Sequence, residues 1–160
     1  MNINIRKATV QDAKGISKLI TSLTAKYICP TCDDSMHDIL LRSMSESKVT
    51  EYLSDDYDYD YDYVVATNDK HEIIGVSGIR DKSHLYHLFV SDDYQGQGLS
   101  RKLWENVKSE ALKNGNQGRF TVNSAVNSES VYLKFGFVRT EGIRNREGMI
   151  DIPMVLESTC

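Results

Sequence analysis

Cysteine is scarce in this sequence, and long apolar runs are missing from it. The chain of 160 residues has three cysteines, an odd number that argues against a framework of disulfide bonds. No segment approaches the roughly 18 uninterrupted apolar residues of a membrane span, and the opening MNINIRKATV has no apolar signal-peptide core. We therefore expect a cytoplasmic protein with no membrane partner.

The cysteines do not form a recognisable metal site either. Cys29 and Cys32 are close together in CPTC, but a structural zinc ion needs four ligands and only His37 lies nearby in the sequence. Cys160 is far from both. We expect ordinary reduced thiols and no metal.

Positive charge is in deficit, and the common nucleotide-binding motifs are missing. The 19 lysines and arginines are outnumbered by 23 aspartates and glutamates, which gives a net charge of -4 and no overall field to attract nucleic acid. There is no GxxxxGK[ST] motif, and a dinucleotide-binding pattern would need a third glycine near Arg101. We expect no nucleic-acid partner and disfavour a nicotinamide or nucleoside-triphosphate enzyme.

The residues that are present predict one domain over residues 1–160. The hydrophobic content of 40% is enough for one core, and the chain is too short for two ordinary domains. INIRKA alternates as a half-buried strand does, and Thr9 and Asp12 are placed to begin an amphipathic helix. Two further helical stretches follow, around residues 39–44 and 49–53.

The biased segment DDYDYDYDY spans residues 55–63. Its strict alternation would lay tyrosines on one face of a strand and aspartates on the other. We interpret it as a solvated loop. The alternative is an acidic, aromatic rim that attracts a cationic substrate.

The second half of the chain is rich in strands. YVVATND, IIGVSGIRD and SHLYHLFVS predict an antiparallel meander over residues 63–91. Apolar residues recur every four positions from Leu99 to Ala111, which predicts a long helix that stops at Asn114 and Gly115. A strand in RFTVNSAV, a short helix in SESVYLKF and two closing strands complete a mixed α/β sheet with a crossover.

Two glycines, Gly96 and Gly98, separate the strand HLYHLFV from the long helix. A helix N-terminus presents unpaired N–H donors and a partial positive charge, and glycines before it let a phosphate approach the backbone. Alone, this pattern is weak evidence, because such turns also serve geometry only.

Three motifs in the right order make the pattern more specific. Gln95, Gly98 and Ser100 resemble the [RQ]xxGx[GA] signature of the GNAT N-acetyltransferase superfamily, although Ser100 stands where Gly or Ala is usual. IRKATVQDA resembles that family's first strand and helix start. NSESVYLKFGF resembles its segment of Asn, Ala, Tyr and Gly-Phe, with Ser130 in place of the Ala. The resemblance covers essentially the whole chain.

The resemblance implies a central mixed sheet of about six to seven strands flanked by about four helices. It also implies a splay between the fourth and fifth strands, where acetyl-coenzyme A binds with its pyrophosphate on the glycine turn. The cofactor-binding positions that it implies are Leu88, Phe89, Val90, Gln95, Gly96, Gln97, Gly98, Leu99, Ser100, Arg101, Asn127 and Ser130.

Acyl transfer to an amine needs a proton for the leaving thiolate, a donor for the oxyanion and a base for the amine. By resemblance, Tyr132 is the general acid and the Leu88 N–H is the oxyanion donor. His84 ranks first as the base, ahead of Tyr86 and His87. Strand alternation predicts that His84 and Tyr86 share a face with Leu88, and that His87 shares the other face with Phe89.

We therefore expect an acetyl-coenzyme A dependent N-acetyltransferase that acts on a primary amine by direct attack in a ternary complex. The alternatives are a non-catalytic acyl-coenzyme A sensor of the same fold and a structural interaction protein. The acceptor can be a small-molecule or a protein amine, and a homodimer is possible because relatives often form one.

Overall fold

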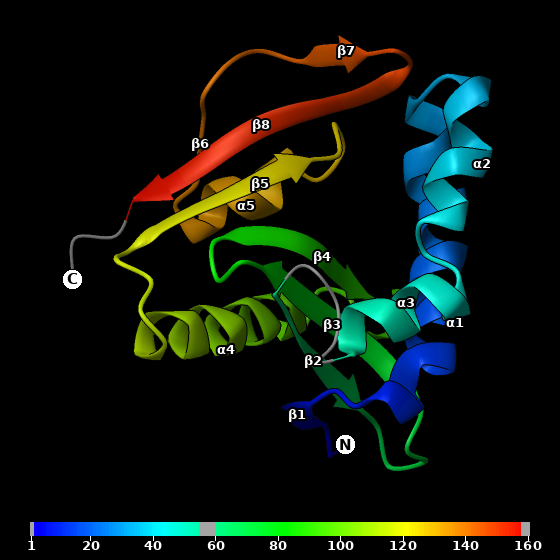
Figure 1. The fold of residues 1–160 in the computed structure, drawn as a ribbon, viewed down its shortest axis with the longest axis vertical. Helices are drawn as coiled ribbons and strands as arrows, with labels where there is room; N and C mark the ends of the chain where they lie inside the picture. Colours follow the sequence, from blue (N-terminus) through cyan, green and yellow to red (C-terminus); the bar gives the residue numbers. More distant parts are fainter. Residues whose placement is uncertain (1, 55–59, 158–160) are drawn as a thin grey trace.

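The computed structural model describes residues 2–54 and 60–157 and folds them into a mixed sheet with helices on both faces (Figure 1). The strand order is β1-β2-β3-β4-β5-β8-β6, and β7 pairs with β8. The strands are β1 (Asn4–Lys7), β2 (Tyr61–Thr67), β3 (Ile73–Arg80), β4 (His84–Val90), β5 (Arg119–Ser124), β6 (Val138–Arg139), β7 (Arg144–Arg146) and β8 (Met149–Glu157). The α-helices are α1 (Ala13–Leu23), α2 (Asp34–Arg42), α3 (Glu46–Leu53), α4 (Leu99–Lys113) and α5 (Glu129–Phe135).

The sheet confirms the predicted topology. Strands β2, β3 and β4 form the antiparallel meander, and β4 then pairs in parallel with β5 after the crossover through α4. The described residues form more strands than the resemblance implied, because β6 and β7 are short pieces along β8. Helices α2 and α3 correspond to the two helical stretches that the sequence predicted after the first helix. Among the described helices, none is both long and apolar enough to cross a bilayer.

The predicted splay between β4 and β5 is confirmed. The two strands pair only at His84 with Thr121 and at Leu85 with Val122. Beyond Leu85, β4 continues beside β3 alone, and Figure 1 shows β5 and β8 running away from it. The sheet therefore opens along most of β4.

Two groups of buried side chains cover the two faces of the sheet. Trp104 from α4, Phe120 from β5 and Phe137 pack with Tyr132 on one face. On the other face, residues of α1 and α3 pack against β2, β3 and β4; its fully buried members include Ile16, Ile20, Val49, Val65 and Val76. We call these the α4/α5 face and the α1/α3 face.

A β-bulge at Tyr86 corrects the predicted alternation along β4. Leu85 lies opposite Ile79 and His87 lies opposite Gly78, so Tyr86 is the extra residue between them. Leu85 and Leu88 consequently pack on the α4/α5 face. Tyr86, His87 and Phe89 lie on the α1/α3 face, and the Tyr86 and His87 ring centroids are 4.3 Å apart. Leu88 therefore does not share a face with Tyr86, because one inserted residue reverses the alternation.

The segment DDYDYDYDY falls partly outside the described residues, at 55–59. Its last residues, Tyr61 to Tyr63, belong to β2 rather than to the loop that we predicted. Tyr61 and Tyr63 stack with Tyr52 of α3 on the α1/α3 face. Burial raises the pKa of Asp62, which lies between them in the strand.

Candidate active site

A cavity of about 510 Å³ opens at the splay between β4 and β5. Leu85, Leu88 and Val122, which line it, belong to the α4/α5 face. Tyr86 and Phe89, which also line it, belong to the α1/α3 face. Residues of both faces of the sheet therefore line the cavity.

The glycine turn forms one end of the cavity. Gly96 and Gly98 have φ angles of 77° and 78°, which favour glycine, and Gly98 is the N-cap of α4. A Cβ atom added to either glycine would meet no atom within 4 Å. The glycines are therefore required by backbone conformation and not by protein packing, and the space above them is free for a ligand.

The backbone of β4 presents two donors to the cavity. The Ser91 N–H donates to the Ile74 carbonyl at 2.8 Å, and the N–H groups of an antiparallel strand point alternately to its two sides. The Leu88 and Val90 N–H groups consequently point toward β5, which has already diverged. The Gln95 side chain donates to the Val90 carbonyl at 3.0 Å and joins the glycine turn to the strand end.

Tyr132 reaches the cavity from α5. The residue is buried, and burial raises the pKa of its phenol to about 12. Its ring packs edge-on against Phe135 and Phe137, which holds its orientation. Within residues 2–54 and 60–157 no group forms a hydrogen bond with its hydroxyl. The hydroxyl is therefore available to a ligand.

A bridge from the segment after α1 crosses the cavity. The Tyr27 hydroxyl donates to Asp92 at 2.6 Å, and the neighbouring Lys26 forms an ion pair with the same carboxylate at 2.7 Å. The Asn127 side chain donates to the Tyr27 carbonyl at 2.8 Å. Asn127 is consequently not the N-cap of α5; that position belongs to Ser128. The bridge joins the ends of β4 and β5 where the sheet no longer does.

His84 lies at the closed end of the splay. Its Nδ1 is 2.8 Å from the Thr121 hydroxyl, and the residue does not line the cavity. Burial, and then the positive charges of Arg80 and Arg144, lower the pKa of His84 to about 4. The imidazole is therefore neutral at pH 7.

His87 is separated from the cavity. It is buried, and burial lowers its pKa to about 3. Its Nδ1 lies 2.7 Å from the hydroxyl of Tyr63, whose pKa burial raises well above its ordinary value. The two groups therefore share a buried hydrogen bond in which the imidazole is neutral, and the pair is part of the core.

The cavity gathers most of the residues that the sequence proposed for it. Those that line it are Leu88, Phe89, Val90, Gln95, Gly96, Gly98, Leu99, Ser100, Asn127 and Tyr132. Gln97, Arg101, Ser130 and His84 do not line it. Arg101 donates to the Lys134 carbonyl and lies over the Phe135 ring, so it joins α4 to α5.

Sequence reasoning missed part of the cavity wall. The lining residues that it did not propose as site residues are Leu23, Tyr27, Ile28, Leu85, Tyr94, Val122, Asn123, Ala125, Ser128 and Val131. The sequence did contain a signal for three of these residues. Ser128 and Val131 lie within the motif NSESVYLKFGF, and Asn123 lies shortly before it. Leu23, Tyr27 and Ile28 had none, because an apolar helix end and the residues after it look like core.

Comparisons with known proteins agree with this geometry. The family model described as "Acetyltransferase (GNAT) domain" matches residues 30–158. The fold resembles that of a GCN5-related N-acetyltransferase from Rhodopseudomonas palustris, with a TM-score of 0.81 and 17% sequence identity. The match covers 99% of this chain and 97% of that protein's chain. PaiA N-acetyltransferase from Thermoplasma acidophilum, solved in complex with coenzyme A, has a TM-score of 0.78 at 17% identity over 99% of this chain and 100% of its own.

A third solved structure, apo YjaB from Escherichia coli, has a TM-score of 0.72 at 18% identity and covers both chains fully. Identities this low establish a shared fold and nothing finer. The family model spans most of the chain and includes the glycine turn, the splayed strands and Tyr132. On this evidence the chain belongs to the GNAT family of acetyltransferases.

Proposed function

We propose that the protein is an acetyl-coenzyme A dependent N-acetyltransferase that transfers the acetyl group directly to a primary amine. The observation that carries this proposal is the cavity at the β4/β5 splay, which residues of both faces of the sheet line. In a direct transfer, the acetyl donor and the amine must lie next to each other in one site. A cavity lined from both faces supports that arrangement.

The glycine turn is the proposed seat of the coenzyme A pyrophosphate. The backbone N–H groups at the start of α4 are free to donate to phosphate oxygens, and the helix dipole favours a negative charge there. The overall charge of -4 does not favour an anion, so these local groups must supply the binding energy. PaiA, which shares this fold, was solved with coenzyme A bound.

Each chemical step has a candidate group. The amine nitrogen attacks the thioester carbonyl, and the Leu88 N–H is placed to stabilise the oxyanion. Tyr132 then donates its phenolic proton to the departing thiolate. Its raised pKa means that the phenol is protonated at neutral pH before the reaction begins. The cysteines Cys29 and Cys32 do not line the cavity, which agrees with transfer that forms no acyl-enzyme.

His84 is the proposed acceptor of the amine proton. Its imidazole is neutral at pH 7 and held by Thr121, so one ring nitrogen remains for a water molecule. Because its pKa is about 4, the proton would pass quickly to solvent. Replacing His84 by Ala should lower kcat by about 10-fold or more with little change in acetyl-coenzyme A binding.

The decisive experiment measures free coenzyme A released from acetyl-coenzyme A across a panel of amines. Tyr132→Phe should lower kcat by roughly 100-fold or more, because general acid catalysis is typically worth that much. The Km for acetyl-coenzyme A and the thermal stability should remain near those of the wild type, since the ring packing is kept. Full turnover by Tyr132→Phe would reject the acid role.

The same experiment separates this function from that of an acyl-coenzyme A sensor. A sensor would bind acetyl-coenzyme A in calorimetry and release no thiol with any amine. A protein with an unrelated role on this fold would bind no coenzyme A at all.

A further inference from the structure

Arg80 is unusual among the arginines of this chain. It lies at the end of β3 and is half-buried, and its guanidinium forms no ion pair or hydrogen bond within the described residues. Every other arginine of the chain forms an ion pair. A guanidinium that no carboxylate holds is available to an anionic ligand.

The position of Arg80 connects it with the candidate active site. It lies directly opposite His84 in the β3/β4 ladder, so the two side chains share a face. Its guanidinium carbon is 5.8 Å from the ring centroid of Tyr86, which lines the cavity. The unpaired charge therefore lies next to a residue of the cavity wall on the α1/α3 face.

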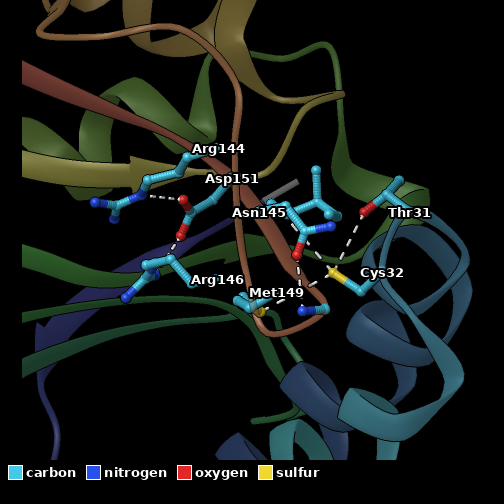
Figure 2. A network of polar contacts seen from close by, with 9 residues as sticks. Thr31, Cys32, Arg144, Asn145, Arg146, Met149 and Asp151 are labelled. Carbon is cyan, nitrogen blue, oxygen red and sulfur yellow. Dashed lines mark hydrogen bonds and ion pairs between the residues drawn. The ribbon is translucent and has the colours of Figure 1, made fainter.

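Asp151 of β8 holds two more arginines, Arg144 and Arg146 (Figure 2). Arg144 and Arg146 each contact one oxygen of this buried carboxylate at 2.6 Å. The arrangement uses both carboxylate oxygens and leaves other N–H donors of each guanidinium free. The positive charge of Arg144 also acts on His84, which places it toward the same end of β4.

Positive and negative groups are mixed in this region. Asp151 holds Arg144 and Arg146, and the charge of Glu141 also acts on Arg144. On the other side of Arg80, Asp60 forms an ion pair with Lys82. Within the described residues, Arg80 is thus the arginine that no carboxylate holds.

We propose that the acceptor is a small primary amine that also carries a carboxylate, and that Arg80 binds this carboxylate. This inference rests on the proposed acetyltransferase function. A planar guanidinium matches a carboxylate with two parallel hydrogen bonds, which would orient the amine toward the splay. A diamine or polyamine would bring a second positive charge against Arg80 and bind weakly.

The test compares amines that differ only in the carboxylate. Release of coenzyme A is measured with 4-aminobutanoate, butylamine and 1,4-diaminobutane, and with phenylalanine against phenethylamine. The carboxylated member of each set should have the higher kcat/KM. Arg80→Met should lower that value by about 10- to 100-fold, the worth of one hydrogen bond to a charged group. It should change the values for the uncharged amines by less than about 3-fold.

Matched controls separate this effect from a change in folding. Arg119→Met removes an exposed arginine that pairs with Glu157, and it should leave every substrate unchanged. Arg80→Lys keeps the charge without the planar pair of donors, and it should recover part of the preference. Equal loss for all amines in Arg80→Met, or a wild-type preference for the diamine, would overturn the proposal.

The outcomes also distinguish this inference from the proposed function. If acetyl-coenzyme A binds and uncharged amines are acetylated as well as carboxylated ones, the function stands and the inference fails. If no amine is acetylated, calorimetry of 4-aminobutanoate with the coenzyme A complex decides: binding that Arg80→Met abolishes supports the inference, and no binding rejects it. Absence of any coenzyme A binding would reject the function itself.

Discussion

The two sides of the cavity are built in different ways. On the α4/α5 face, its wall includes one continuous stretch, the end of β4 followed by the glycine turn and the start of α4, with α5 beside it. On the α1/α3 face, the groups near its wall come from β3, β4, β5 and β7. We call them the glycine side and the arginine side.

The difference follows from what each side must present. The glycine side offers backbone N–H groups, which any sequence has, so it needs only a conformation that exposes them. The arginine side offers side chains, whose identity and position come from distant parts of the chain. A binding function common to a family is therefore expected on the glycine side, and the choice of acceptor on the arginine side.

The largest effect is expected from Gly78→Ala, which breaks the arginine side alone. An added Cβ would overlap the ring of Tyr63, which is buried beneath the bulge at Tyr86. Overpacking of this kind destabilises by about 1–3 kcal/mol, which lowers the Tm by several degrees. Gly142→Ala, where nothing lies within 4 Å, is the control. Equal Tm values for the two variants in calorimetry would show that the packing is looser than it looks.

Lowering the pH should destabilise the protein through His87, which is buried on the α1/α3 face. The pKa of His87 is about 3 in the folded protein and 6.5 when exposed, so the unfolded chain binds the proton first as the pH falls. The stabilising effect of the neutral His87 is complete above pH 6.5 and is lost as the pH falls from there toward 3. The loss at pH 5 is about 2 kcal/mol.

Denaturant unfolding of the wild type and His87→Gln at pH 7, 6 and 5 measures this contribution. The glutamine keeps an acceptor for the Tyr63 hydroxyl and does not titrate. The free energy of unfolding of His87→Gln should fall less steeply than that of the wild type as the pH is lowered. Part of the pH dependence remains in the variant, because His84 has a lowered pKa of about 4. Parallel curves for the two proteins would contradict the prediction.

A smaller effect is expected from Gly98→Val, which breaks only the glycine side. The left-handed conformation of Gly98 disfavours valine, and its side chain would occupy the space above the turn. The Kd for acetyl-coenzyme A should rise by about 10-fold, as measured by calorimetry. Gly115→Val has the same type of backbone strain at the other end of α4 and should leave the Kd unchanged.

The smallest effect is expected from Ser100→Gly. If backbone N–H groups carry the phosphate contacts, removing the Ser100 hydroxyl should change the Kd for acetyl-coenzyme A by less than about 2-fold. A loss of 10-fold would show that the glycine side also depends on a side chain, which would weaken the contrast between the two sides.

Much of the fold was readable from short stretches of sequence. Periodicity predicted the meander and the helix from Leu99, and the capping positions Thr9 and Asp12 do begin the first helical segment. The predicted alternation of side chains along β4 was wrong at Tyr86. A β-bulge inserts one residue there, and the sequence of an apolar strand does not show where a bulge occurs. The interpretation of residues 55–63 as a loop was wrong from Tyr61 on, although their alternation is that of a strand. Composition favoured a solvated loop, and the packing of Tyr52 of α3 against Tyr61 is not visible in the sequence.

The residues of the candidate site also fall into those that the sequence predicted and those that only the structure showed. By itself, the sequence determined the glycine turn and the position of Tyr132, since conformational limits on glycine and helix start act over a few neighbouring residues. Only the tertiary structure decided that Tyr27 bridges Asp92 and Asn127, that Thr121 contacts His84 and that Arg80 forms no ion pair within the described residues. These depend on which distant side chains the splayed sheet brings together, and no local preference records that.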